Sequence, residues 1–509
     1  MYRLLETSSD KAEDKNLVSG TLNALANKLW YMAHATDTNL TGKVGIAEGL
    51  TTRSVSKTIT VGSKTYNVPA EENLKDITWK ENGQGQYEYT PEQEKPPVPQ
   101  EQDVDTFTTP ITGDTDQEYV DHHVKKENGL YQFTKDTILK ASANNPSAMI
   151  QISSGKKVTV DASGKELHFD GSGKDNIFFV NNGSTDEIQL TAKKLQLIAN
   201  TDNASFIAGF VNHKGTINGD VDMKFKGGNN SFVYGFKQIN DWTVNGNVTF
   251  NGEGKDVALF DSDNKGSLTF NKDVSIKVQG HGDGSNGNAR GIHINEGTVH
   301  VKGNLNMAGS GDVDSWGIDN SESALKKNIV STVGLYAGGN SFNAGVESRI
   351  QVDGNTSITS TGSGVISEGL GAIVDLRGDV DIRVKKSDGV TNYAVYSKGG
   401  KALINVKENG EELTPGDKNV VLVGDIALEG KNNLNSRMYM ALINENSSWT
   451  GAIQSALKAD LDKIGAAAHG QIYLQNGAQW NHIHQSAMGG DSIVQSFVGG
   501  DTNQTYGVI

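Results

Sequence analysis

The chain contains no cysteine, only 8 prolines among its 509 residues, and only 35% hydrophobic residues. Without disulfides, a fold with so little apolar content must gain its stability from repeated burial or from a partner. No apolar run approaches the ~20 residues that a membrane-spanning helix needs, and the first residues lack the apolar segment of a signal peptide. We therefore expect neither a membrane anchor nor a signal peptide within this sequence.

Positive charge is also scarce, because 46 Lys and Arg stand against 61 Asp and Glu, for a net charge of −15. Such an acidic surface repels phosphate backbones, so we expect no nucleic-acid partner. Glycine, in contrast, is abundant, with 60 residues, about 12% against a usual ~7%. Many glycines with few prolines exclude collagen and argue against most compact α/β enzymes. The length and composition together favour one elongated repeat domain.

The first 89 residues are expected to form a small α/β region. Apolar residues recur at helical spacing and predict an amphipathic helix within the first 35 residues: Val18, Leu22, Leu25, Ala26, Leu29 and Trp30. Short alternating segments, such as Thr58–Val61 and Tyr87–Tyr89, predict hairpin strands. Residues 90–106 combine half of the prolines with Glu and Gln, which predicts an extended linker.

From residue 107 to residue 509, short alternating strands are separated by Gly, Asn, Asp and Ser. A Gly-Asp/Asn pair followed by alternating residues recurs at Gly219, Gly246, Gly303, Gly354, Gly378 and Gly424, and Asp273 begins a similar unit. The glycine spacings are one or two multiples of roughly 23 to 28 residues, which is typical of a solenoid. Leucine-rich and helical repeat patterns are missing, so we predict an all-β fold, a right-handed parallel β-helix of about 14 to 16 coils.

One segment near residues 452–467 departs from this pattern. Ile453, Leu457, Leu461 and Ile464 have helical spacing and predict a helix inserted in the β-helix. Strand character resumes at residues 471–480 around an Asn-Gly turn.

The segments Ser447–Gly451 and Ile472–Trp480 resemble the late coils of passenger domains in type Va autotransporters. Residues 23–31 and 39–50 look like segments of large adhesin-like autotransporters from anaerobic, outer-membraned bacteria. The resemblance implies a location at the bacterial cell surface. It also implies a signal peptide upstream of these residues and, downstream of them, an outer-membrane barrel that would be the chain's link to the membrane.

Arg377-Gly378-Asp379 is the sharpest short motif. In integrin ligands an exposed Arg-Gly-Asp loop offers a guanidinium to an acidic pocket and a carboxylate to a metal ion. A second interpretation is structural, because Gly378-Asp379 is one of the recurring coil corners and turn chemistry alone explains its aspartate.

The densest group of ionisable residues comprises His281, Asp283, Arg290, His293, Asp312 and Asp314. Some β-helix polysaccharide lyases and hydrolases use carboxylates with Arg or Lys on an outer face, so this group is a candidate glycan-cleaving site. Alternatively, its members occupy solvated loops. His482 and His484 alternate on one strand, but two ligands do not complete a metal site, and we predict neither a metal nor a cofactor.

Three functions remain open, since β-helices support all of them. The first is an extracellular adhesin that makes many weak contacts with a host receptor, a glycan, a matrix protein or copies of itself on other cells. The second is a glycan-active enzyme on the same scaffold. The third is a structural stalk that holds another segment away from the cell.

Overall fold

The computed structural model describes five strands between residues 43 and 89 and three between 104 and 127. Beyond them it describes, with short gaps at loops, residues 130–311, 332–339, 347–455, 468–483 and 496–499. The chain divides into two compact units, Met1–Asp103 and Val104–Ile509.

The first unit contains a five-stranded sheet of order β1-β4-β5-β3-β2. Its strands are β1 (Lys43–Val44), β2 (Lys57–Val61), β3 (Lys64–Val68), β4 (Ile77–Glu81) and β5 (Gln86–Tyr89). β2 and β3 form an antiparallel hairpin, so the predicted strands in this region are present. The helix predicted for the first 35 residues lies outside the described part of the chain.

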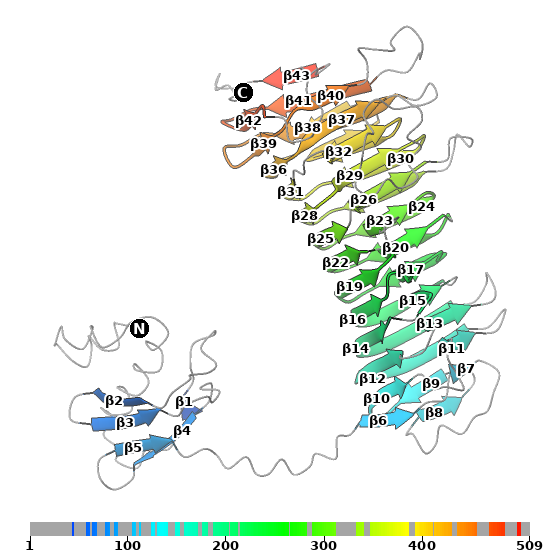
Figure 1. Cartoon of the computed structure of the whole chain (residues 1–509), viewed down its shortest axis with the longest axis vertical. Helices are drawn as coiled ribbons and strands as arrows, with labels where there is room; N and C mark the ends of the chain where they lie inside the picture. Colours follow the sequence, from blue (N-terminus) through cyan, green and yellow to red (C-terminus); the bar gives the residue numbers. More distant parts are fainter. Residues whose placement is uncertain are drawn as a thin grey trace. The chain divides into compact units, whose positions relative to one another are not determined.

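The second unit is a parallel β-solenoid in which each coil contributes strands to three stacked ladders, A, B and C (Figure 1). Ladder A contains β9 (Leu130–Phe133), β18 (Asp241–Val244), β21 (Ser267–Phe270), β24 (Gly297–Val301), β27 (Ser348–Val352), β30 (Ala372–Leu376), β33 (Lys401–Ile404), β38 (Ser436–Leu442), β41 (Ala468–Leu474) and β43 (Ser496–Gly499).

Ladder B contains β6 (Val104–Phe107), β10 (Asp136–Lys140), β19 (Val248–Gly254), β22 (Val274–Gly280), β25 (Leu305–Gly311), β28 (Thr356–Ser360), β31 (Val380–Val384), β36 (Val420–Val423), β39 (Ser448–Thr450) and β42 (Gln479–Asn481). Three long strands pass through the corner between ladders A and B and belong to both: β12 (Lys157–Gly171), β14 (Glu187–Thr201) and β16 (Lys214–Gly227). These shared strands join ladders A and B into one sheet.

Ladder C is a separate 12-stranded sheet. Its strands are β7 (Ile111–Thr112), β11 (Ala148–Ile152), β13 (Asn176–Asn181), β15 (Phe206–Val211), β17 (Phe232–Lys237), β20 (Asp256–Ser262), β23 (Asn288–Ile294), β26 (Thr332–Gly338), β29 (Ser363–Glu368), β32 (Tyr393–Lys398), β37 (Asp425–Glu429) and β40 (Ile453–Ser455). Two further strand pairs among the described residues are antiparallel. β8 (Val124–Glu127) pairs with β9, and β34 (Val406–Asn409) forms a hairpin with β35 (Glu412–Pro415).

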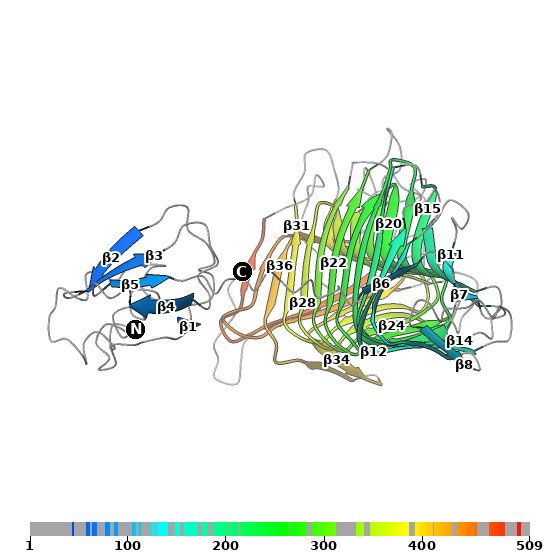
Figure 2. The ribbon, with the colours of Figure 1, turned by 90° about the horizontal axis from the view of Figure 1, so that it is seen from below.

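The core fills the inside of the coils, and it follows from period-two alternation. In β22 every second residue from Val274 to Gly280 is buried, and the residues between them are exposed. Identical side chains stack from coil to coil, as in the column Phe179, Phe210 and Phe236, whose ring centroids lie 4.6 and 4.7 Å apart. Each such inward side chain stabilises the fold by about 1.5 to 3 kcal/mol. Figure 2 looks along this stack, with successive coils lying over one another.

The register corrects the predicted coil boundaries. Gly303 and Gly354 lie on consecutive coils, because Leu305 pairs with Thr356, so their spacing is one coil lengthened by a loop. Gly424 is not an A–B corner, because Asp425 begins β37 in ladder C. The residue that follows Asp379 at this corner is Asn419. Loops lengthen individual coils, and within the described residues ladder C has 12 strands, fewer than the roughly 14 to 16 coils predicted.

Two segment boundaries also differ from the predictions. β6 begins at Val104, inside the predicted 90–106 linker, because its residues pair with β10. The helix predicted near 452–467 does not begin at its first turn, where Ile453–Ser455 is a strand paired with β37. The β pairing overrides helical spacing here, and residues 456–467 of the predicted helix lie outside the described part of the chain.

Candidate functional sites

The corner between ladders A and B carries a column of Asp and Asn residues that explains the recurring Gly-Asp/Asn pair. We call it the Asx column: Asp220, Asn247, Asp273, Asn304, Asn355, Asp379 and Asn419. In five steps of the column, the backbone N–H of one member donates to the side-chain Oδ1 of the member before it, at 2.8 to 3.0 Å. The column therefore satisfies backbone donors that the corner would otherwise leave outside the strand ladder.

Gly378 and Asp379 of the Arg-Gly-Asp motif belong to this column. The N–H of Asp379 donates to Asn355 Oδ1 at 3.0 Å, and Asp379 Oδ1 accepts the N–H of Asn419 at 2.9 Å. A Cβ atom placed on Gly378 would lie 2.3 Å from the carbonyl oxygen of Gly354 on the coil before. Coil stacking therefore requires glycine at this position, and the aspartate supplies a side-chain acceptor.

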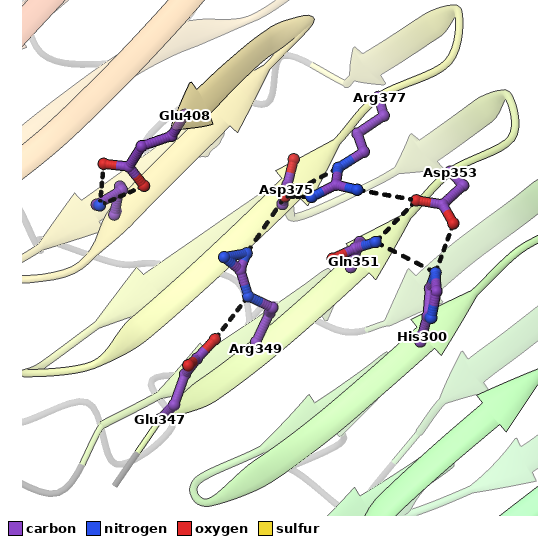
Figure 3. Close-up of polar contacts among 9 residues, drawn as sticks. His300, Glu347, Arg349, Gln351, Asp353, Asp375, Arg377 and Glu408 are labelled. Carbon is purple, nitrogen blue, oxygen red and sulfur yellow. Dashed lines mark hydrogen bonds and ion pairs between the residues drawn. The ribbon is translucent and has the colours of Figure 1, made fainter. Parts of the chain in front are cut away.

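Arg377 takes part in a different network, on the outer face of ladder A (Figure 3). Its Nη2 lies 2.8 Å from Asp375 Oδ2, and its Nη1 lies 3.4 Å from Asp353 Oδ1. The side chain of Asp375 is only 3% exposed and also accepts Arg349 Nη1 at 3.2 Å. Burial opposes the charge of Arg377, but the Asp375 carboxylate raises the pKa of the guanidinium above its ordinary value.

The network continues to the coil before through Asp353. His300 Nε2 lies 2.5 Å from Asp353 Oδ2, and Gln351 Nε2 donates to Asp353 Oδ1 at 2.8 Å. Burial acts against ionisation, yet the hydrogen bonds from His300 and Gln351 lower the pKa of Asp353 below its usual range. Arg377 and Asp379 thus face different partners, and this geometry favours the turn interpretation of the motif. Receptor binding by Arg377, Gly378 and Asp379 stays a prediction.

The second predicted group is divided between ladders. His281 follows β22 of ladder B and lies 3.2 Å from Glu253, whereas Arg290 and His293 lie on β23 of ladder C. Asp283, Asp312 and Asp314 lie outside the described residues, so the structure does not test their part in a common site.

Arg290 and His293 form part of a buried ionic cluster. Arg290 Nη2 lies 2.5 Å from Asp256 Oδ1 and 3.3 Å from Asp261 Oδ2. Asp261 also lies 3.3 Å from His293 Nδ1 and 2.5 Å from Lys237 Nζ. The side chains of Arg290, His293 and Asp261 are at most 5% exposed, so a substrate would have to displace neighbouring groups to touch them.

Electrostatics in the buried cluster keep Asp261 ionised. Burial alone would raise the pKa of Asp261, but the contact with His293 and the charges of Arg290 and Lys237 lower it far below its usual range. Burial and the Arg290 charge lower the pKa of His293. The sequence reasoning missed Asp256, Asp261 and Lys237, which come from other coils. Only the strand register could have identified these residues, because it brings side chains 24 to 34 positions apart in the sequence into contact.

The outer face of ladder B carries an open groove of about 480 Å³ that the sequence reasoning also missed. Two outward columns flank it. The first places Lys224, Asn251 and Lys277 on successive coils, and the second places Lys226, Glu253 and Gln279 beside them. Ala199, Phe225 and Gly252 lie between the flanking columns.

Within the described residues, no group of three or more His, Asp or Glu side chains is placed to hold a metal ion. The same residues contain no helix long and apolar enough to cross a membrane. Comparisons of the chain with protein-family models, with curated proteins and with solved structures give no match.

Proposed function

We propose that this chain is an extracellular binding protein of the adhesin type, displayed at a bacterial cell surface as the passenger of an autotransporter. The fold supports the proposal, because a parallel β-solenoid is typical of autotransporter passengers. Its ligand is a host receptor, a glycan, a matrix protein or a second copy of the chain on another cell.

The accessibility of ladder B is the observation that carries the proposal. In β22 and β28 the outward positions are exposed and polar: Ser275, Lys277, Gln279, Ser357 and Thr359. In β23 and β26 of ladder C, by contrast, every residue is buried. At β22 and β28, ladder B thus offers accessible hydrogen-bonding side chains on its outer face.

A repeating face suits the binding of an extended ligand. Successive coils lie about 4.8 Å apart, so one ligand chain can contact several coils at once. Each contact is weak, but simultaneous contacts raise the effective concentration of the next one, and the total affinity grows. Binding of this kind needs no single essential residue.

The test is binding of the purified full chain to arrays of glycans and matrix proteins, followed by adhesion of beads coated with it. A double variant, Ser275→Trp with Ser357→Trp, covers ladder B. The matched control, Thr243→Trp with Thr269→Trp, places the same bulk on ladder A, where both threonines are half-buried and point outward. We expect saturable binding that the ladder B variant loses and the ladder A variant keeps.

Two results would contradict the proposal. Absence of saturable binding on every array and of adhesion by the beads would indicate a structural stalk. Equal binding by both variants would remove ladder B as the contact face. Clumping of coated beads without added ligand would identify a second copy of the chain as the partner.

A further inference from the structure

The groove on ladder B differs in charge from the rest of the molecule. Three lysines, Lys224, Lys226 and Lys277, line it together with one carboxylate, Glu253, so the lining carries a net charge of +2. The whole chain carries −15. The local excess of positive charge attracts an anionic ligand to the groove, and the negative charge of the rest of the chain repels the same ligand elsewhere.

The lysines are available to a ligand. The side chains of Lys224 and Lys226 are 54% and 52% exposed, and their carboxylate partners, Asp222 and Glu253, lie 3.2 and 3.6 Å away. Exposed pairs of this length contribute little and exchange readily for a competing anion. Lys277 is exposed and forms no ion pair with the described residues. Lys224 and Lys277 stand two coils apart, about 10 Å along the axis.

The remaining groove residues favour a sugar over other anions. Asn251 and Gln279 place amide groups between and beside the lysines, where each can both donate to and accept from hydroxyl groups. Single-stranded nucleic acid is held largely by aromatic stacking, and Phe225, the aromatic residue in the lining, is buried.

We propose that this groove binds an acidic polysaccharide, with Lys224, Lys226 and Lys277 holding its carboxylate or sulfate groups and Asn251 and Gln279 holding its hydroxyls. The inference rests on the proposed binding function and specifies its ligand class. Two anionic groups of one glycan chain, separated along it by the two-coil spacing, occupy the positions beside Lys224 and Lys277.

The experiment measures binding of the full chain to two matched pairs of probes by calorimetry or interferometry. Polygalacturonate is compared with its methyl ester, and dextran sulfate is compared with dextran, so the pairs separate carboxylate from sulfate. We expect binding to at least one acidic probe and none to its neutral counterpart. Lys224→Gln with Lys277→Gln lowers that affinity about tenfold, since two charged contacts are lost.

Lys272→Gln with Lys302→Gln is the control, because it removes the same two charges from exposed positions outside the groove. It should bind within about twofold of the parent chain, and matching melting curves of both variants exclude misfolding. An equal loss in both variants, failure to bind any acidic probe, or comparable binding of single-stranded DNA would overturn the inference. If the chain still binds a neutral glycan or a matrix protein, the proposed function survives and only the acidic ligand is wrong.

Discussion

The Asx column predicts that Asp379 acts through its side-chain oxygen and not through its charge. Asp379 Oδ1 accepts the N–H of Asn419, and four of the seven members of the column are asparagines that offer the same acceptor. Asp379→Asn should therefore retain the stability of the parent chain within about 0.5 kcal/mol. Asp379→Ala leaves the Asn419 donor without this acceptor and should cost about 1 kcal/mol, as for the loss of a helix N-cap.

Hydrogen–deuterium exchange measures the stability change of each variant near Asn419. A local measurement is needed because a solenoid does not unfold as a single two-state unit. Peptides that include the Asn419 amide should exchange faster in Asp379→Ala and unchanged in Asp379→Asn. Asp379→Asn also separates the receptor-binding interpretation of the Arg-Gly-Asp motif from the turn interpretation. A receptor that binds the Asp379 carboxylate through a metal ion would not bind the Asp379→Asn variant. Faster exchange in Asp379→Asn, equal to that of the alanine variant, would refute the hydrogen-bond reasoning.

Three further predictions concern the ladder A network, the buried cluster and the end of the solenoid. Arg377→Ala should lower the local opening free energy around β30 by about 1 kcal/mol, because the buried Asp375 carboxylate loses a partner, and hydrogen–deuterium exchange of β30 peptides measures it. The pKa of His293 is lower in the folded chain than in the unfolded chain. The stability that neutral His293 contributes is therefore complete above pH ~6.5 and is lost as the pH falls below that value. Melting curves recorded from about pH 7.5 to about pH 5 should show this loss. Trp449→Ala should cost about 3 to 5 kcal/mol, because it removes a fully buried ring stacked 4.5 Å from Trp480, and exchange near β39 and β42 reports it.

The arginine and histidine predictions each have a control. Arg383→Ala removes an exposed arginine paired with Asp381 and should change stability by less than about 0.5 kcal/mol. His293→Gln should flatten the acid side of the melting profile, while His168→Gln, at a half-buried histidine whose pKa burial also lowers, should flatten it less. An unchanged profile in His293→Gln, or equal effects of the two arginine variants, would show that the assigned contacts do not contribute as argued.

Period-two alternation made the solenoid predictable, because the inward positions of Val274 and Ile276 recur on the neighbouring ladder B strands whatever the coil length. Coil boundaries were less predictable. The Gly-Asp pair at Gly424 has the same local chemistry as that at Gly378, but only the second lies at an A–B corner, because neighbouring coils and not the dipeptide decide the register. At Ile453–Ser455 the predicted helix was wrong for the same reason, since pairing with β37 outweighs local periodicity, and residues 456–467 of that prediction lie outside the described part of the chain.

The candidate sites could not be predicted from the sequence, because the strand register brings together residues that are far apart in the chain. Lys224 and Lys277 are 53 positions apart in the sequence, yet both pair with Asn251 from opposite sides. Asp256 and Arg290 meet across one coil in the same manner. In a solenoid the inward residues determine the fold while outward columns remain free to change, so charge accumulates down a column without disturbing the core. The acidic glycan that we propose would contact the groove column, whose charge of +2 contrasts with −15 for the whole chain, so its lysines, and not the Arg-Gly-Asp corner, are the first residues to substitute.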